Sequence, residues 1–302
     1  MIELVGVVKR YTAKRPGRGL LDSLFPKEHL LTAVDHVSLR VKKLEHFGLL
    51  GPNGAGKTSI LSLIAGLCLP TSGTIRLGSK KIGVMLGHKM IYHRMTGYDN
   101  LKYFSQIYKV GNYHSRIREL SSQFKLQPFL HEYVERYSLG MRVKLALARS
   151  LVHDPAILLL DEPTLGLDIH VAAEVRAYIT SLKKTIILTT HYLEEADELC
   201  ERVAILNKGR IIAIDSPQVL KNISGSPSIR VSLKEKNQLE QELLKRKIPF
   251  TRDDGNFQIF YQGPDQLQLA ISLLSTHRIS SLSTSQPTLG DAFIALTGEE
   301  LE

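Results

Sequence analysis

The stretch Gly51-Pro52-Asn53-Gly54-Ala55-Gly56-Lys57-Thr58 follows an apolar run at residues 47–50 and precedes a helix-compatible run at residues 59–65. A strand, a glycine-rich loop ending in Lys-Thr and then a helix form the setting in which a phosphate is bound. Glycines let successive backbone N–H groups turn toward a phosphate, where a Cβ would block the approach. The helix start adds further N–H groups and the positive end of its dipole. A turn that binds nothing is the alternative, and the Lys-Thr ending argues against it.

Two side chains at the end of this loop carry the expected chemistry. We expect the Lys57 ammonium to reach the β- and γ-phosphates of a nucleotide and the Thr58 hydroxyl to hold Mg²⁺. Ser59 begins the helical run, and we include it with the eight loop residues among the groups that contact the nucleotide. A nucleotide with β- and γ-phosphates and Mg²⁺ are therefore the expected ligands of this loop, and the family resemblance described below implies that the nucleotide is ATP.

A second candidate site lies where the apolar run at residues 157–160 ends in Asp161-Glu162. Such a run is typical of a strand buried on both faces, and ligands bind at the carboxyl ends of strands in open α/β sheets. We expect Asp161 to join the Mg²⁺ shell and Glu162 to orient or deprotonate an attacking water. Two acids after a buried strand are usually structural, but here a phosphate loop precedes them in the same chain.

Composition places the chain among ordinary globular proteins. Its 302 residues are 43% hydrophobic and 23% charged, which allows one large domain with a small one, or two domains. No apolar run approaches the roughly 18 residues of a membrane span, and the first residues have no signal-peptide pattern. We therefore expect a cytoplasmic protein. Cys68 and Cys200 have no metal-ligand spacing and are interpreted as buried apolar residues.

The net charge of +9 is concentrated in part near the N-terminus, in a basic cluster formed by Lys9, Arg10, Lys14, Arg15 and Arg18. Three interpretations are a solvated face, contact with anionic lipid headgroups and contact with nucleic acid. A solvated face is the commonest of these. No groove-reading motif supports nucleic acid, so a nucleic-acid partner is not expected.

Strands and helices alternate along the first two-thirds of the chain, which predicts an α/β fold with a mostly parallel, helix-covered sheet. Residues 96–136 show no strand pattern, and a further helix is expected after them. Together these residues predict a helical subdomain at about residues 96–152. The stretch Thr12–Leu31 is rich in Pro, Gly and basic residues, and we expect a loop with a short helix there.

The last part of the chain has a different pattern. Residues 224–302 read as strand, helix, strand, strand, helix and strand, with an Asp-Asp-Gly-Asn turn at residues 253–256. This order predicts a small ferredoxin-like α+β domain. No catalytic spacing occurs within it, and we place the boundary with the first domain, residues 1–223, at residue 224.

Five ordered motifs resemble those of an ABC-transporter ATPase subunit across roughly residues 2–222. In chain order, the motifs are GPNGAGKT at residues 51–58, YSLGMRVKLALARSL at 137–151 in the place of the family signature, ILLLDEP at 157–163, LGLD at 165–168 in the place of the D-loop, and TTH at 189–191, which contains the switch histidine. The resemblance implies a P-loop NTPase with a RecA-like core, an antiparallel β subdomain and a helical subdomain.

The resemblance further implies a head-to-tail dimer in which each ATP lies between one phosphate loop and the signature of the other copy. Ser138 and Gly140 would then meet the γ-phosphate across the interface, since a helix start suits an anion. His191 would contact the γ-phosphate of its own site and Asp168 would couple the two sites. By themselves, His191 is as well explained as a hydrogen-bonding histidine and Ser138 as a helix N-cap.

Three positions bear on how closely the chain follows the family. Tyr11 falls where the family stacks an aromatic ring on adenine, although an isolated surface tyrosine is the simpler interpretation. Leu139 replaces a glycine of many signatures, so we expect retained binding with altered packing across the dimer. The Q-loop glutamine is missing from residues 86–89 (LGHK), where His88 is the best substitute and Gly87 the alternative after a one-residue shift.

The segments at residues 193–212 and 287–298 resemble those of exporter ATPases of the drug-resistance and sodium-extrusion type. We therefore expect an ATP-hydrolysing subunit, peripheral on the cytoplasmic face of the cell membrane. Its expected partners are separate membrane permease subunits and a second ATPase subunit, in a homodimer or a paired arrangement. The alternative is an ABC ATPase acting on ribosomes or DNA, which the single ATPase unit and the absence of long heptads disfavour. The Asp161-Glu162 pair disfavours a nucleotide sensor without turnover.

Overall fold

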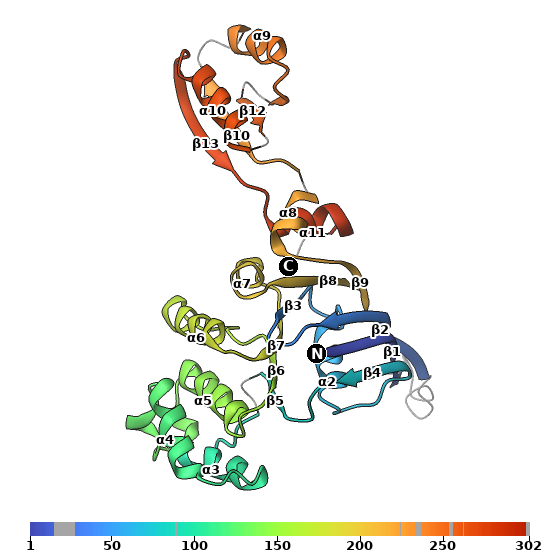
Figure 1. Ribbon diagram of the computed structural model, residues 1–302, viewed down its shortest axis with the longest axis vertical. Helices are drawn as coiled ribbons and strands as arrows, with labels where there is room; N and C mark the ends of the chain where they lie inside the picture. The colour runs from blue at the N-terminus through green and yellow to red at the C-terminus, as the bar shows by residue number, and fades with distance from the viewer. Residues whose placement is uncertain are drawn as a thin grey trace, which may run out of the picture. The chain divides into compact units, whose positions relative to one another are not determined.

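The computed structural model describes residues 1–14, 28–87, 90–223, 225–233, 237–253, 256–261 and 263–299. The chain divides into two compact units, Met1–Pro217 and Gln218–Glu300 (Figure 1). In the sequence, the division falls within helix α8 (Pro217–Ile223). Among the helices of the described residues, none is both long enough and apolar enough to cross a membrane.

In the described part of the first unit, six strands form one sheet whose members are mostly parallel. Its order is β5-β6-β7-β3-β8-β9, and only β9 runs antiparallel to its neighbour. Strands β3 and β7 are buried along their whole length, as expected for a sheet with both faces covered. The strands are β3 (His46–Leu50), β5 (Ile82–Leu86), β6 (Ile157–Asp161), β7 (Thr185–Thr190), β8 (Arg202–Asn207) and β9 (Arg210–Asp215).

A second sheet of this unit is antiparallel, with the order β2-β1-β4. Its strands are β1 (Ile2–Lys14), β2 (Glu28–Val41) and β4 (Ser72–Leu77). The loop predicted for Thr12–Leu31 is wrong at both ends, because Tyr11 pairs with Leu31 and Lys14 with Glu28. Backbone hydrogen bonds extend this hairpin to Lys14 and Glu28. This part of the hairpin lacks the alternation of apolar and polar residues by which a strand is recognised in the sequence. The short helix predicted in that stretch lies outside the described residues.

Helices of the first unit cover the parallel sheet and extend from one edge of it. Figure 1 shows α3, α4 and α5 grouped beyond the β5 edge. A core of buried apolar side chains, including Val37, Phe47, Leu49 and Ile60, joins the two sheets to α2. The helices are α2 (Lys57–Ile64), α3 (Gly97–Ile107), α4 (Tyr113–Gln123), α5 (Leu139–Leu151), α6 (Ile169–Ser181) and α7 (Leu193–Leu199), with 3₁₀ turns at Gln127–Phe129 and Val134–Arg136.

The second unit has the predicted β-α-β-β-α-β element order. Its antiparallel sheet has the order β11-β12-β10-β13, and its core contains Val231, Leu243, Phe257 and Leu273. Helix α11 (Leu289–Thr297) follows the last strand. The other elements are β10 (Ser228–Leu233), α9 (Asn237–Lys245), β11 (Phe250–Asp253), β12 (Asn256–Phe260), α10 (Gly263–Leu274) and β13 (Ile279–Ser285).

Candidate active site

The phosphate loop, residues 51–58, connects β3 to the start of α2. Gly54 and Gly56 have φ angles of 81° and 99°, in a region that residues with a Cβ rarely adopt. A Cβ on Gly56 would also lie 2.3 Å from the carbonyl oxygen of Ala33. Gly56 is the N-cap of α2 and provides no side-chain cap, so the first amides of this helix remain available to an anion.

Lys57 crosses the mouth of this loop with its side chain only 5% exposed. Its Nζ donates to the carbonyl oxygens of Gly51 at 2.5 Å and Pro52 at 3.2 Å, and lies 3.7 Å from Glu162 Oε1. Burial lowers the pKa of the Lys57 ammonium, and the charges of Glu162 and Asp161 oppose that shift. The ammonium is therefore held by groups that an incoming phosphate can replace.

Asp161, at the end of β6, meets Thr58 at the start of α2. The Thr58 hydroxyl donates to both carboxylate oxygens of Asp161, at 3.0 and 3.2 Å. Strand pairing places Thr189 of β7 opposite Asp161, and the Thr189 hydroxyl donates to Asp161 Oδ1 at 2.5 Å. A carboxylate beside a hydroxyl is a set of hard oxygen donors that suits Mg²⁺, which completes its shell with phosphates and water. The residues present therefore fit this metal.

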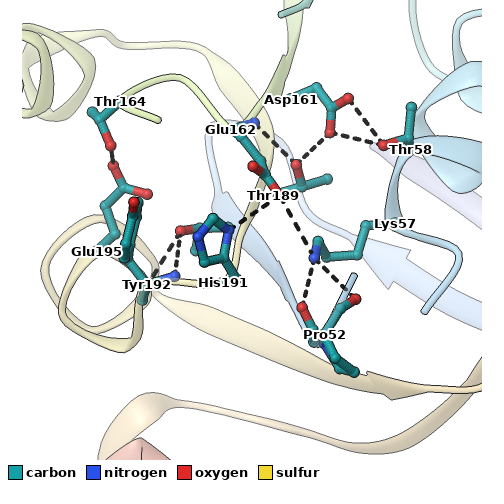
Figure 2. Close-up of polar contacts among 12 residues, drawn as sticks. Pro52, Lys57, Thr58, Asp161, Glu162, Thr164, Thr189, His191, Tyr192 and Glu195 are labelled. Carbon is teal, nitrogen blue, oxygen red and sulfur yellow. Dashed lines mark hydrogen bonds and ion pairs between the residues drawn. The ribbon is translucent and has the colours of Figure 1, made fainter. Parts of the chain in front are cut away.

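Glu162 follows Asp161 in a left-handed backbone conformation, with a φ of 47°. Its N–H lies 3.1 Å from both the carbonyl oxygen and the hydroxyl of Thr189. On its side chain, Oε1 lies 3.2 Å from His191 Nδ1, although the pair is not aligned as a hydrogen bond. Figure 2 shows the Glu162 carboxylate between Lys57 and His191. The three candidate catalytic residues are thus brought together within one chain.

Ser138, Gly140 and Asp168 occupy helix starts. Ser138 caps α5 by accepting from Met141 N at 3.2 Å, and Asp168 caps α6 by accepting from Val171 N at 3.0 Å. A Cβ on Gly140 would lie 2.9 Å from Val171 Cγ1, so this glycine allows close contact between α5 and α6. Within the described part of the chain, the hydrogen bonds of Ser138 and Asp168 do not reach the phosphate loop.

Tyr11 and His88 are the two remaining predicted nucleotide contacts. Tyr11 lies in β1 and is 37% exposed, with its hydroxyl 3.9 Å from Cys68 Sγ and Lys9 Nζ 5.0 Å from its ring centroid. His88 lies outside the described residues. The structure thus leaves the Tyr11 ring partly exposed within the β1–β2 hairpin of the antiparallel sheet.

Sequence reasoning missed Thr189, Thr164 and Glu195. The hydroxyl of Thr164 donates to Oε1 of Glu195, a carboxylate that is almost completely buried. Thr189 is the first residue of the TTH motif and Thr164 directly follows ILLLDEP, and these positions in the sequence were a weak signal that both lie at the site. Their contacts depend on which strands and helices are neighbours, and that order is not written in local sequence.

Comparisons with known proteins identify the family of this chain. Residues 34–165 match the family model described as ABC transporter. The chain is 39% identical over 203 residues to the ABC transporter ATP-binding protein NatA of Bacillus subtilis, covering 62% of this chain and 82% of the relative. It is 34% identical over 286 residues to a fluoroquinolones export ATP-binding protein of Mycobacterium tuberculosis, covering 89% of each.

A solved structure agrees on the fold. A dimeric ATP-binding cassette in a post-hydrolysis state with ADP and Pi matches with a TM-score of 0.62 and 23% identity, over 72% of this chain and 98% of that chain. The predicted fold, a P-loop NTPase with a parallel sheet, is confirmed. Each of the two relatives above is more than 30% identical to this chain over at least 82% of its own length. The chain therefore belongs to the ABC transporter family, among its ATP-binding subunits.

Proposed function

We propose that this ABC transporter ATPase hydrolyses ATP at the site formed by Lys57, Thr58, Asp161, Glu162 and His191. The observation that carries the proposal is the position of the Glu162 carboxylate, 3.7 Å from Lys57 Nζ and 3.2 Å from His191 Nδ1. A base at the mouth of a phosphate loop, beside a cation and an imidazole, is arranged to act on a water that attacks the γ-phosphate.

Binding would use the backbone first. The backbone N–H groups of residues 53–59, which include the start of α2, would surround the phosphates, and Lys57 would exchange the carbonyl oxygens of Gly51 and Pro52 for phosphate oxygens. Thr58 and Asp161 would hold Mg²⁺, which would supply positive charge that offsets the negative charge of the phosphates. The exposed ring of Tyr11 is the group we assign to the adenine base, and His88 to the Q-loop position.

The reaction is the hydrolysis of ATP to ADP and phosphate. Glu162 Oε1 accepts a proton from the attacking water as the new P–O bond forms and the bond to the β–γ bridging oxygen breaks. Lys57 and His191 lie on either side of that carboxylate, and we assign both to the negative charge of the γ-phosphate. The backbone of the loop contributes positioning, because most of the barrier in phosphoryl transfer is lowered by alignment and charge.

A second copy of the chain completes the site in this proposal. Its Ser138, its Gly140 and the first turn of its α5 would face the γ-phosphate, and Asp168 of each copy would lie between the two sites. Two observations support this arrangement: Ser138 is exposed, and the N-terminus of α5 has the backbone N–H groups and positive dipole end that bind anions. Relatives named as ATP-binding proteins for fluoroquinolone export and daunorubicin resistance support export through separate membrane permease subunits, with this chain on the cytoplasmic face.

Two experiments test the proposal on the full chain. In the Glu162→Gln variant, MgATP should convert a monomer to a dimer in size-exclusion chromatography with light scattering, and EDTA should reverse it. The Lys57→Ala variant is the control that stays monomeric. An oligomeric state that ignores MgATP in both variants contradicts the shared site. Fractionation of cells gives the second test, because recovery with ribosomes or DNA instead of a membrane permease contradicts the transport role.

A further inference from the structure

Two short segments hold the reacting side chains, and each is held to the other at more than one point. Residues 161–164 contain Asp161 and Glu162, and residues 189–195 contain His191. Glu162 has a left-handed φ of 47°, a conformation that persists in a residue with a Cβ only where its surroundings hold it. The direction of the Glu162 carboxylate therefore depends on what fixes the backbone on both sides of it.

On the strand side, Thr189 fixes this backbone. Its hydroxyl accepts from the Glu162 N–H at 3.1 Å and donates to Asp161 Oδ1 at 2.5 Å, so both of its hydrogen-bonding roles point into the 161–164 segment. Thr189 is fully buried, and water does not compete for these contacts. Thr189 therefore fixes the backbone at Asp161 and Glu162, and it stands two residues before His191 in its own segment.

On the helix side, the matching contact joins Thr164 to Glu195. Thr164 stands two positions after Glu162, in a turn where Leu165 N donates to Glu162 O at 3.3 Å and Leu167 N to Thr164 O at 3.1 Å. The Thr164 hydroxyl donates to Glu195 Oε1, and both side chains are buried, at 5% and 3% exposure. Figure 2 shows this pair beyond His191, on the opposite side from Asp161 and Thr58.

The carboxylate of Glu195 is otherwise poorly explained by folding alone. Its Oε2 is buried without a hydrogen-bond partner among the described residues, and burying a carboxylate in this way is costly. An acid in the first turn of α7 is favourable for the helix dipole, yet the exposed neighbour Glu194 provides that effect without burial. The buried contact with Thr164 is what distinguishes Glu195.

We propose that Glu195 is a positioning residue for hydrolysis, which acts through Thr164 to keep the Glu162 carboxylate beside His191. Thr189 and Glu195 hold the two ends of the pair of segments, and the Glu162–His191 contact lies between them. This inference rests on the proposed role of Glu162 as the base. Loss of either partner leaves the phosphate loop intact and lets the turn after Glu162 shift, which lowers kcat and leaves KM for ATP unchanged.

The test compares Thr164→Val and Glu195→Ala with Glu195→Gln and Thr164→Ser, which keep the acceptor and the hydroxyl. We expect kcat to fall about tenfold in the first two, with KM within about twofold and near wild-type kcat in the conservative pair. The double variant Thr164→Val/Glu195→Ala should fall no further than either single variant, since both remove one contact. Glu194→Ala is the matched control, expected to keep wild-type kcat.

Single-turnover hydrolysis in the Glu162→Gln background separates positioning from general damage. Adding Glu195→Ala there should not lower the residual rate, because the group being positioned is already gone. A further tenfold fall, or wild-type kcat in both Thr164→Val and Glu195→Ala, overturns the inference. If Glu195→Ala fails to fold, Thr164→Val and Glu195→Gln give the same comparison. Full turnover by Glu162→Gln alone would contradict the proposed role of Glu162 as the base. That result differs from one in which the losses in kcat from Thr164→Val and Glu195→Ala add, which would contradict only the positioning role of Glu195.

Discussion

The hydroxyl of Thr58 donates to both carboxylate oxygens of Asp161, at 3.0 and 3.2 Å, across 103 residues of sequence. This contact ties the start of α2 to the end of β6. The oxygen donors for a metal and the amides for a phosphate are therefore adjacent in the folded chain. Substitutions within the site should accordingly change binding or turnover more than the fold.

Lys57→Ala should lower the affinity for MgATP at least about tenfold. A hydrogen bond to a charged group contributes about 1.5–3 kcal/mol, and about 1.4 kcal/mol corresponds to a factor of ten. Equilibrium titration with a fluorescent ATP analogue measures the change. Lys80→Ala, at an exposed position, is the control with unchanged affinity. Undiminished affinity in Lys57→Ala would contradict the assignment of the phosphate loop.

Glu162→Gln should bind ATP as the wild type does and lose turnover by about 10²–10⁴-fold, the usual contribution of a general base. The amide keeps the size of the side chain and cannot take a proton from water. Steady-state phosphate release and nucleotide binding are measured on the same preparation, with the exposed Glu194→Gln as the control. Normal hydrolysis by Glu162→Gln removes Glu162 from this role.

Gly140→Ala should destabilise the chain although alanine favours helices. The helix gains about 1 kcal/mol from the change, but the new Cβ would lie 2.9 Å from Val171 Cγ1, and forcing apart packed groups costs about 1–3 kcal/mol. The midpoint of thermal unfolding should fall, and Val171→Ala in the same chain should restore it. A higher midpoint for Gly140→Ala alone would show that Val171 yields without cost.

Glu174 should contribute stability that depends on pH. Hydrogen bonds from Lys125 and then Lys144 lower the pKa of Glu174 to about 2 from 4.5, so the folded state binds this proton less readily than the unfolded state. The stabilisation is complete above pH 4.5 and is lost as pH falls toward 2. We expect Glu174→Gln to lower the free energy of unfolding by less than about 1 kcal/mol at pH 7, because the Lys125 and Glu174 side chains are 71% and 44% exposed.

Denaturant unfolding of wild type and Glu174→Gln at several pH values checks this expectation. The difference between the two proteins should shrink as pH is lowered from 5 toward 3, and it should also shrink in about 1 M salt, where exposed ion pairs are screened. A difference that grows on acidification has the opposite sign to the one derived from the lowered pKa. This would show that Lys125 and Lys144 do not stabilise the charged form of Glu174.

Much of the fold could be predicted because its signals are local. The order of glycines, Lys57 and Thr58 is written in adjacent residues, as is the apolar run that ends in Asp161 and Glu162. The run at residues 157–160, interpreted as a buried strand, lies within β6, and the strand and helix order predicted for residues 224–302 is the order that the structure gives. Apolar runs and turn residues determine such elements over a few positions.

The contacts that complete the site were decided only by the tertiary structure. Thr189 reaches Asp161 because β6 and β7 pair in one register, and Glu195 reaches Thr164 because α7 packs beside the turn after β6. The longer hairpin of β1 and β2 likewise depends on backbone pairing between Lys14 and Glu28. Sequence alone determined which chemical groups are present and their order, since each signal spans a few residues. Folding determined which distant groups touch, because strand register and helix packing are set by the whole core.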